Sequence, residues 1–468
     1  MDLQKFQRLH FIGIGGMGMR ALAEILIEKG MKISGSDVHN SDYLQFMKKQ
    51  GADIFIGHEA SHVDGADGIV ISSAIHSDNP ELSAARKKGI PVYHRSDVLA
   101  AMFQWGKGIA VAGAHGKSTT SAMIGKIFRD AGVDPTIVLG GAVDYLHGNS
   151  CLGSGEYVIA EADESDGSFL KFKSSVAVVT NIEDDHLDHY GTVENIKKAF
   201  VEFISHISDP TGAAIVCIDS QGVREVLPDL NRKVLTYGMS EEAEYRAVNK
   251  HYDKNHMIFD VQHKGKLLGS LKLQIPGTHN VRDALAAAVT GLYCGIPFRS
   301  IAKSLSEFIG VKRRFETKAY INDIWILDDY AHHPTEIEAT LRAAKEIGGH
   351  RVICAFQPHR YSRTQLLQDE FASAFDSADK LYFTDIYAAG ENPIAGVDGH
   401  LLPEKVRQHA PGKEVQYIDN LNGLAEQLYQ EARPGDMIFT IGAGTIYQAG
   451  EQLIRLIQDK GLANDNKE

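Results

Sequence analysis

The sequence predicts an α/β protein of three domains, and three observations lead to this fold class. The chain has 468 residues, more than one hydrophobic core usually organises, since single domains rarely exceed about 250–300 residues. Short apolar segments alternate with helix-like segments along most of the chain, a pattern typical of parallel sheets covered by helices. Two glycine-rich turns, at residues 13–18 and 113–118, each lie between an apolar strand and a helix. They predict two separate sites for phosphate groups.

The first alternation predicts an N-terminal, Rossmann-like domain with a parallel sheet over residues 1–106. It contains a helix-like segment at 19–30 and apolar strands at 9–14, 32–37, 68–75 and 90–94. The segment FQWGKG at 103–108 then precedes a new strand. We therefore expect the first domain boundary there.

The second alternation predicts a central, P-loop ATPase-like domain over residues 107–312. Its apolar strands begin at 109, 157, 175 and 213, and a helix opens at Thr278. The stretch 256–275 is typical of a hairpin with a Lys-Gly turn, so the sheet of this domain is expected to be mixed.

The third alternation predicts a C-terminal, Rossmann-like α/β domain over residues 313–468. Apolar strands followed by polar turns begin near 324, 351, 380 and 435. The tail from Gly461 onward is polar and is expected to be frayed.

Composition excludes several classes of protein. Lys and Arg number 48 against 61 Asp and Glu, a formal net charge of −13, so a broad surface for nucleic acid or an anionic membrane is not expected. The four cysteines lie far apart without a CxxC pair, which favours neither a disulfide framework nor a zinc site. The start of the chain lacks the apolar core of a signal peptide, and no apolar run reaches the length of a membrane span. We expect a cytoplasmic protein, either monomeric or dimeric.

The first glycine turn has the spacing of a dinucleotide fingerprint. Gly13, Gly15 and Gly18 match G-x-G-x-x-G, and Asp37 ends the next strand. Backbone N–H groups at a helix N-terminus suit a diphosphate, and the carboxylate suits ribose hydroxyls. The turn itself leaves three interpretations open: NAD or FAD, another ligand with a diphosphate, or a tight turn with a purely structural role.

The second glycine turn is more specific. Gly113-Ala114-His115-Gly116-Lys117-Ser118 contains the GK[ST] triplet of a P-loop, although Val111 stands where the first glycine of the strict pattern belongs. In such a turn the lysine neutralises the transferred phosphate and the serine can ligate Mg²⁺. We therefore assign this turn to ATP.

Two acidic strand ends follow in the same domain. They are EADESD at 161–166 and NIEDDH at 181–186. Because the carboxyl ends of parallel strands meet at one edge of a sheet, these carboxylates are expected beside Ser118, where they would hold Mg²⁺. The alternative interpretation is a solvated acidic loop or a helix cap.

Several motifs in order along nearly the whole chain resemble those of the Mur ligases. They include HFIGIGGMGM, AGAHGKSTT, EADESDGSF, TNIEDDHLDHYG, VKRRFE, DDYAHHPTEI and FQPHRYSRT. The resemblance is strongest to the alanine-adding members of the family. It implies an ATP-dependent ligase of peptidoglycan precursor synthesis, which joins UDP-N-acetylmuramate to L-alanine. In this family the substrate carboxylate takes the γ-phosphate of ATP as an acyl phosphate, and the amine then displaces phosphate.

The resemblance also implies which side chains act. The expected catalytic residues are Lys117, Asn181, His186, Arg314 and Asp329, and the expected ligands of two Mg²⁺ ions are Ser118, Glu161 and His186. ATP is expected to contact Gly113, His115, Gly116, Lys117, Ser118, Thr119, His279, Asn280, Arg314 and Asp329. The two other substrates are expected to contact Gly13, Gly15, Gly16, Gly18, Asp37, Ser72, Ser73, His76, Tyr330, His359, Arg360 and Arg363.

Alternatives and departures accompany this assignment. One alternative is a recycling ligase that adds the tripeptide L-Ala-γ-D-Glu-meso-diaminopimelate; a distant one is an NAD-dependent oxidoreductase, which would leave Lys117 and Ser118 without a role. Asn280 has the alternative interpretation of a helix cap. The chain departs from the family pattern at Arg20, Ala114, Asp283 and Thr445, where a small residue, threonine, asparagine and aspartate are expected.

Overall fold

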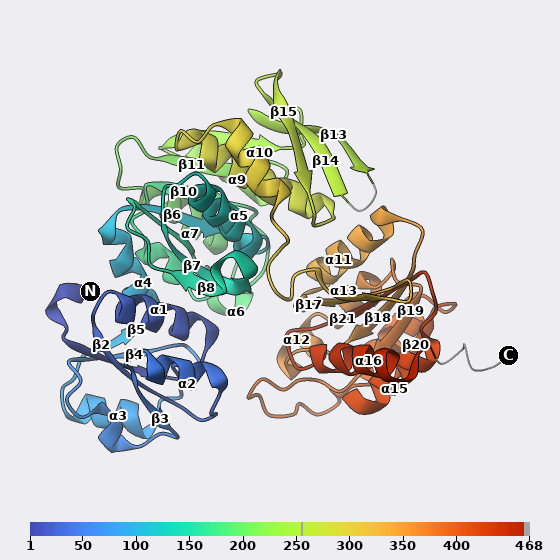
Figure 1. Ribbon diagram of the computed structural model, residues 1–468, viewed down its shortest axis with the longest axis horizontal. Helices are drawn as coiled ribbons and strands as arrows, with labels where there is room; N and C mark the ends of the chain where they lie inside the picture. Colours follow the sequence, from blue (N-terminus) through green and yellow to red (C-terminus); the bar gives the residue numbers. More distant parts are fainter. Residues whose placement is uncertain (254–255, 463–468) are drawn as a thin grey trace. The chain divides into compact units, whose positions relative to one another are not determined.

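The computed structural model describes residues 1–253 and 256–462, so the end of the predicted frayed tail lies outside the described residues. Three sheets confirm the three-domain α/β architecture (Figure 1). The chain divides into two compact units. The first comprises Met1–Lys250, Ile258–Lys272 and Val281–Phe308, and the second comprises His251–Met257, Leu273–Asn280 and the chain from Ile309 onward. The domain limits 1–106, 107–312 and 313–468 stay a prediction.

The N-terminal sheet is parallel, with the strand order β3-β2-β1-β4-β5. Its strands are β1 Arg8–Ile12, β2 Lys32–Asp37, β3 Asp53–Ile56, β4 Gly68–Ile71 and β5 Val92–His94. Its helices are α1 Met17–Glu28, α2 Asp42–Lys49, α3 Pro80–Lys87 and α4 Arg95–Met102, with short 3-10 turns η1 Leu3–Lys5, η2 Ala60–Val63 and η3 Phe103–Trp105. The topology reverses at β1, between β2 and β4, so the first glycine turn leaves the sheet at the point where α/β proteins bind ligands.

The central sheet has ten strands in the order β15-β14-β13-β12-β11-β10-β6-β9-β7-β8. They are β6 Lys107–Ala112, β7 Thr136–Val143, β8 Gly148–Cys151, β9 Tyr157–Glu161, β10 Val176–Val179, β11 Ala213–Cys217, β12 Lys233–Gly238, β13 Tyr245–Asp253, β14 His256–His263 and β15 Lys266–Leu273. The helices are α5 Lys117–Asp130, α6 Leu187–Tyr190, α7 Val193–Ser205, α8 Gln221–Val226, α9 Thr278–Tyr293 and α10 Phe298–Ser306, with 3-10 turns η4 Asp144–Leu146, η5 Ser168–Lys171 and η6 Leu227–Asp229.

The predicted hairpin and the mixed sheet are both present. Strands β14 and β15 are neighbours, joined by Lys264 and Gly265 with φ of 49° and 78°. Two positive φ angles are what a two-residue hairpin turn requires. Strand β8 pairs antiparallel to β7, whereas β6 lies parallel between β9 and β10. The second glycine turn therefore leaves a fully parallel part of the sheet.

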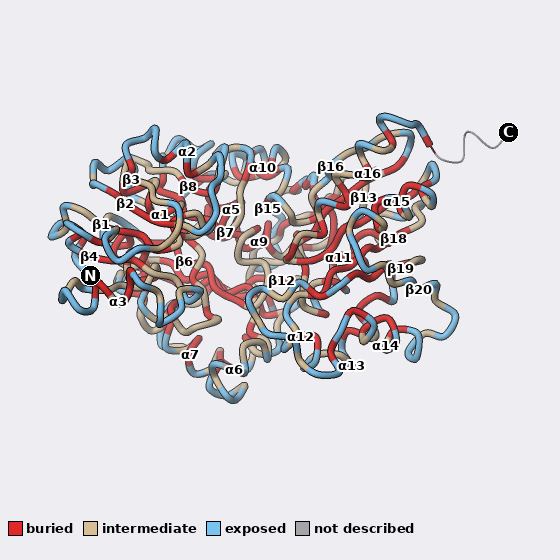
Figure 2. The backbone as a smooth tube through the Cα atoms, turned by 90° about the horizontal axis from the view of Figure 1, so that it is seen from below, coloured by how far each residue is buried: buried red, intermediate tan, exposed pale blue. Residues whose placement is uncertain are grey.

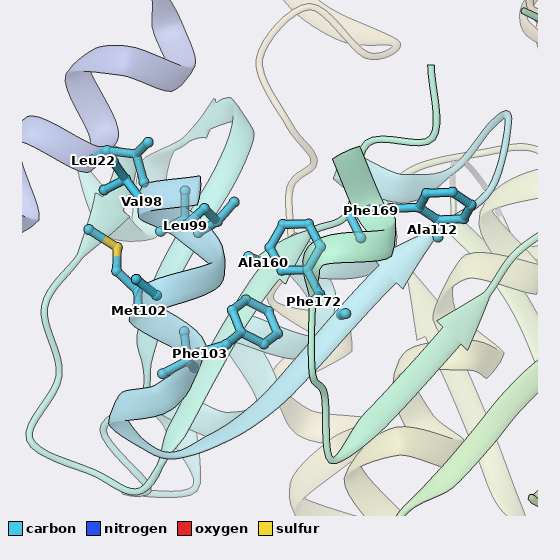
Figure 3. Close-up of a cluster of buried hydrophobic side chains, with 14 of the residues drawn as sticks. Leu22, Val98, Leu99, Met102, Phe103, Ala112, Ala160, Phe169 and Phe172 are labelled. Carbon is cyan, nitrogen blue, oxygen red and sulfur yellow. The ribbon is translucent and has the colours of Figure 1, made fainter. Parts of the chain in front are cut away.

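One hydrophobic core joins the N-terminal and central domains. Leu22 of α1 and Val98 and Met102 of α4 belong to the same buried cluster as Ala160 of β9 and Phe172 (Figure 3). Polar contacts also cross between the domains, since the Asn149 side chain donates to the carbonyl of Met17 at 3.2 Å. Because burial of this apolar surface needs both domains, they are expected to fold and move together.

The C-terminal sheet has six strands in the order β16-β17-β21-β18-β19-β20. They are β16 Glu316–Ile321, β17 Ile324–Asp329, β18 Arg351–Phe356, β19 Lys380–Phe383, β20 Glu414–Tyr417 and β21 Asp436–Ile441; the helices are α11 Pro334–Ile347, α12 Tyr361–Leu366, α13 Gln368–Ala374, α14 Leu401–His409, α15 Leu421–Glu431 and α16 Tyr447–Lys460. Strand β16 is antiparallel to β17 and the rest of the sheet is parallel. Buried segments follow the inner strands of the sheets, such as β1, β10 and β21, whereas β3 and β20 are only partly buried (Figure 2).

Candidate active site

The second glycine turn holds its lysine against the backbone and a carboxylate. The Lys117 ammonium donates to the carbonyl of Gly113 at 2.7 Å and to Glu164 Oε1 at 2.7 Å. Burial would lower the pKa of Lys117, but Glu164 and Asp163 raise it. The ammonium is therefore charged and preorganised inside the turn.

Backbone geometry explains why glycine is required in this turn. Gly113 has φ +139°, and a Cβ there would lie 2.1 Å from Thr180 Oγ1. Gly116 has φ +83°, and a Cβ there would lie 2.5 Å from Asp283 Oδ1. Any side chain at either position would push the turn away from its neighbours.

Ser118 contacts a carboxylate at the end of β9. Its hydroxyl donates to Glu161 Oε2 at 3.0 Å, and Glu161 Oε1 accepts from the N–H of Gly140 at 2.5 Å. Hydroxyl and carboxylate oxygens are the hard donors that Mg²⁺ prefers, usually with ligands from phosphates and water. These two residues thus fit the metal. Within the described residues, no group of three or more His, Cys, Asp or Glu side chains is arranged to hold a metal ion.

The strand end after β10 lies beside the same turn. Asn181 Oδ1 accepts from the N–H of His115, and its Nδ2 donates to the carbonyl of His115, both at 3.0 Å. His186, with φ +61°, places Nε2 3.6 Å from Glu164 Oε1 and 3.4 Å from Asp185 Oδ2. Although burial opposes it, Glu164 and Asp185 raise the pKa of His186. Asn181 thus braces the turn, and His186 shares Glu164 with Lys117.

The first glycine turn contains no charged side chain of its own. Gly13 and Ile14 donate backbone N–H groups to the carbonyl of Ser36, and Gly15 N–H donates to Asp37 Oδ2 at 2.9 Å. Gly16 is exposed and forms the N-cap of α1. The turn is therefore shaped by strand β2 and by Asp37 at its end, whose role toward ribose stays a prediction.

A buried carboxylate lies behind this turn. Glu81 of α3 is fully buried and accepts from Ser36 Oγ at 2.5 Å, and the Nδ1 atoms of His62 and His58 lie 2.6 and 3.1 Å from it. Burial would raise the pKa of Glu81, but His10, Ser36 and His62 bring it down to about 2. Glu81 is ionised and holds the end of β2 in place.

The loop after β4 carries the other residues expected at the first turn. The Ile75 side chain of this loop is 3.1 Å from where a Cβ on Gly13 would lie. Ser73 and His76 are exposed, Ser72 is half-buried, and Ser73 Oγ donates to Asp166 Oδ2 at 3.4 Å. The structure thus brings Ser73 to the acidic segment of the central domain.

The start of α9 contributes to each unit. Asp283 Oδ1 accepts from Thr120 Oγ1 at 3.2 Å, so it touches the P-loop helix α5, where Thr119 is also buried. Asn280 is buried and donates to the carbonyl of Pro276, four residues earlier. His279 lies beside Gly277. An N-cap side chain accepts from a backbone N–H, whereas Asn280 donates to a carbonyl, so this bond ties α9 to the segment before it rather than capping the helix.

In the second unit, Arg314 and Asp329 belong to one cluster. Asp329 is buried and accepts from the N–H groups of Phe315 and Ala331, each at 2.8 Å. Burial raises the pKa of Asp329 to about 6, although Arg314 opposes the rise. The Arg314 guanidinium lies 3.4 Å from Glu336 Oε1 and 5.5 Å from the ring of Tyr330.

A second cluster of the same unit combines histidines with arginines. Arg363 Nη1 is 3.2 Å from His359 Nδ1, and the His359 ring lies 5.8 Å from that of His332. Burial, with the charges of His332 and Arg363, lowers the pKa of His359 to about 4. Arg360 is exposed at the N-cap of α12 with φ +71°. Neutral imidazole beside two guanidinium groups makes this cluster suited to an anion.

Sequence reasoning left two partners of the site unassigned. Glu164, the partner of Lys117, lies within the acidic motif, but the motif does not tell which carboxylate faces the lysine. Arg95 at the start of α4 donates to Asp163 Oδ2 at 2.8 Å, and no motif marks it.

Comparison with known proteins identifies the family. Three family models match in order: the Mur ligase family catalytic domain over 8–105, the Mur ligase middle domain over 111–291, and the Mur ligase glutamate ligase domain over 313–444. A UDP-N-acetylmuramate–L-alanine ligase of Geobacter sp. (strain M21) is 46% identical over 451 residues, which are 96% of this chain and 97% of that protein. The chain belongs to the Mur ligase family.

Solved Mur ligase structures agree with this assignment. The UDP-N-acetylmuramate-alanine ligase MurC from Thermotoga maritima is similar at a TM-score of 0.83 and 27% identity, over 97% of this chain and 99% of that chain. The UDP-N-acetylmuramate:L-alanyl-gamma-D-glutamyl-meso-diaminopimelate ligase from Neisseria meningitides is similar at a TM-score of 0.61 and 26% identity, over 66% of this chain and 99% of that chain. In this Mur ligase, no helix of the described residues has the length and apolarity to cross a membrane.

Proposed function

We propose that this Mur ligase joins the carboxylate of UDP-N-acetylmuramate to the amino group of L-alanine, with ATP as the source of energy, in peptidoglycan precursor synthesis. The observation that carries the proposal is the second glycine turn, where Lys117 and Ser118 each contact a carboxylate at or just after the end of β9. The relative from Geobacter, which matches over nearly its whole length, bears the name of this activity. Family membership also removes the oxidoreductase alternative for the first turn.

The residues of the second turn would promote transfer of the γ-phosphate. Lys117 would exchange Glu164 for the phosphates of ATP, since the ammonium is already buried and charged at the required place. The backbone N–H groups at the start of α5 would bind the remaining phosphate oxygens. Ser118 and Glu161 would hold Mg²⁺, with His186 beside a second ion, and bound Mg²⁺ would neutralise charge on the transferred phosphate.

The first turn would hold the UDP part of the sugar substrate. Its N–H groups and the start of α1 suit the diphosphate, and Asp37 suits ribose hydroxyls. Because the first turn has no lysine, it would bind the diphosphate without activating it. The carboxylate of the sugar would react at the second turn instead. Gly15, Asp37, Ser72, Ser73 and His76 are the expected contacts.

The second unit would supply L-alanine and stabilise the acyl phosphate. Arg360 and Arg363 would attract the carboxylate of the amino acid, and His359, neutral at pH 7, would accept a hydrogen bond from its amine. Arg314, beside Tyr330, would neutralise phosphate, and Asp329 would hold the loop at Phe315 and Ala331 in place. The proposal keeps a cytoplasmic location and a monomeric or dimeric state, as expected from the sequence.

Release of phosphate tests the proposal against the recycling alternative. Protein, ATP, Mg²⁺ and UDP-N-acetylmuramate are mixed either with L-alanine or with the tripeptide L-Ala-γ-D-Glu-meso-diaminopimelate, and Lys117→Ala serves as control. Rapid release with L-alanine that the control abolishes is the expected result. Release with the tripeptide alone would move the chain to the recycling branch, of which the Neisseria structure is an example.

A further inference from the structure

The six residues Glu161–Asp166, here called the acidic segment, contact the second glycine turn directly and the first through side chains that lie beside it. Two of its carboxylates contact the second turn: Glu161 accepts a hydrogen bond from Ser118, and Glu164 accepts one from Lys117. These contacts lie within the central domain. They account for half of the four carboxylates in the segment.

The other two carboxylates contact the N-terminal domain. Asp163 Oδ2 accepts from Arg95 Nη2 at 2.8 Å, and Asp166 Oδ2 accepts from Ser73 Oγ at 3.4 Å. His94 Nε2 lies 3.9 Å from Asp166. The carboxylates of the segment therefore serve two domains that share one core.

Arg95 packs against the first turn, and Ser73 belongs to a loop that packs against it. The Arg95 Nη1 atom is 3.4 Å from where a Cβ on Gly18 would lie, so the guanidinium packs against the last glycine of the fingerprint. Ser73 is in the loop whose Ile75 packs against Gly13. A diphosphate on the first turn would meet the same guanidinium that binds Asp163.

The acidic segment is braced as one turn. Asp163 Oδ1 accepts from the N–H and hydroxyl of Ser165, and the carbonyl of Asp163 accepts from the N–H of Phe169. The carbonyl of Glu164 accepts from Gly167 N–H and from the Tyr190 hydroxyl. A shift of Asp163 would therefore move Glu164, which follows it directly.

We propose that Arg95 and Asp163 are positioning residues that couple the two nucleotide sites, so that UDP-N-acetylmuramate on the first turn tightens binding of ATP on the second. The inference rests on the proposed function, because that assigns a ligand to each turn. Each ligand would hold the acidic segment in the position that favours binding of the other ligand. Such coupling is reciprocal: each ligand changes the binding free energy of the other by the same amount. Couplings of this kind are commonly about 5- to 150-fold in affinity.

Calorimetry of a non-hydrolysable ATP analogue with Mg²⁺ measures the coupling. The analogue is titrated into the full chain alone and into the chain saturated with UDP-N-acetylmuramate. In the unaltered protein we expect at least about 5-fold tighter binding in the saturated sample. In Arg95→Gln and in Asp163→Asn the ratio is expected to fall to about 1, and the double variant should lose no more than either alone, since both act through one ion pair. Arg95→Lys should restore part of the coupling.

Lys171→Gln is the matched control. Lys171 also crosses between the two domains, with Nζ 2.7 Å from Asp97 and 3.0 Å from Ser96 Oγ, and among the described residues these contacts include neither glycine turn. The control should keep the full coupling. If Arg95→Gln misfolds by circular dichroism, Asp163→Asn carries the test, since it keeps the shape of the side chain.

The outcomes separate this inference from the proposed function. Binding of both ligands with no mutual effect in the unaltered protein, or undiminished coupling in Asp163→Asn, would overturn the coupling and leave the ligase intact. Failure of UDP-N-acetylmuramate to bind the unaltered protein would overturn the proposed function and this inference with it.

Discussion

The two glycine turns resemble each other in sequence, but their charges lie in different places. The second turn carries a lysine inside it, and the carboxylates Glu164 and Glu161 accept hydrogen bonds from Lys117 and Ser118. The first turn has no charged side chain of its own; its buried carboxylate, Glu81, lies behind strand β2.

This difference suits the second turn to catalysis of phosphoryl transfer and the first turn to binding of a diphosphate. A cation and metal-ligating oxygens stabilise charge that develops during phosphoryl transfer. Neutral N–H groups bind a diphosphate without activating it. The comparison therefore predicts that changes in the second turn affect catalysis, whereas changes in the first affect stability and substrate affinity.

The largest expected effect is on the second turn. Lys117→Ala removes the buried ammonium of this turn and should lower kcat by about 10²- to 10³-fold, as loss of a donor to a transition-state oxyanion does. Binding of UDP-N-acetylmuramate should stay within about twofold, since the first turn is untouched. Steady-state kinetics and calorimetry measure the two quantities. Lys126→Ala, on the same helix but paired with Asp130, is the control and should retain activity; a large loss of UDP-sugar affinity in Lys117→Ala would contradict the division of roles.

The next largest effect is on the support behind the first turn. The pKa of Glu81 falls from 4.5 to about 2 on folding, which corresponds to about 3 kcal/mol of stability. Because the folded pKa is the lower one, this stability is fully present above about pH 4.5 and is lost as the pH falls toward 2. Glu81→Gln should therefore lower the free energy of unfolding by up to about 3 kcal/mol at pH 7, and the difference from the unaltered protein should shrink in acid.

Urea unfolding between pH 3 and 7 checks this pH dependence. The groups facing Glu81 are His10, Ser36, His58 and His62, and they are present in both proteins. Asp64→Asn, which breaks an exposed pair with Lys88 in the same domain, should change stability by no more than about 1 kcal/mol. A difference for Glu81→Gln that is constant with pH would show that the carboxylate contributes packing rather than charge.

A smaller effect is expected from the first turn itself. A Cβ at Gly15 would lie 2.8 Å from Asp37 Oδ2, so Gly15→Ala should displace that carboxylate and raise KM for UDP-N-acetylmuramate about 10-fold, the cost of one to two lost hydrogen bonds. The KM for ATP should change little. Gly412→Ala, where nothing lies within 4 Å of the new Cβ, is the control. An equal rise of both KM values would mean that the two turns are not separate in function.

The sequence predicts what is local and misses what the fold brings together. Lys117, Ser118 and Asp37 follow from short motifs whose backbone context is predictable. Strand β3 was not predicted, because its DIFI segment is short and half-exposed. The antiparallel pairing of β16 with β17 was missed as well, since an alternating pattern does not fix strand direction.

Long-range partners were the harder part of the site. Arg95 lies 68 residues from Asp163 along the chain, and only the packing of α4 on the central domain brings them together. The same packing creates a core with members on both sides of residue 106, where the FQWGKG segment before a new strand predicts a domain boundary. By contrast, two other clusters of buried residues lie within the C-terminal domain alone. One includes Phe315 and Ile441, and the other includes Ile324 and Leu462.

The smallest expected effect is at Asp283, where the resemblance implies asparagine. Its Oδ1 accepts from the buried Thr120 hydroxyl and lies against Gly116. Asp283→Asn keeps an acceptor oxygen at that place, so KM for ATP should change by less than about threefold. Asp283→Ala leaves Thr120 without this acceptor and should raise KM about 10-fold. If Asp283→Asn is as harmful as Asp283→Ala, the negative charge rather than the hydrogen bond supports the second turn, and this chain departs from its family in how that turn is held.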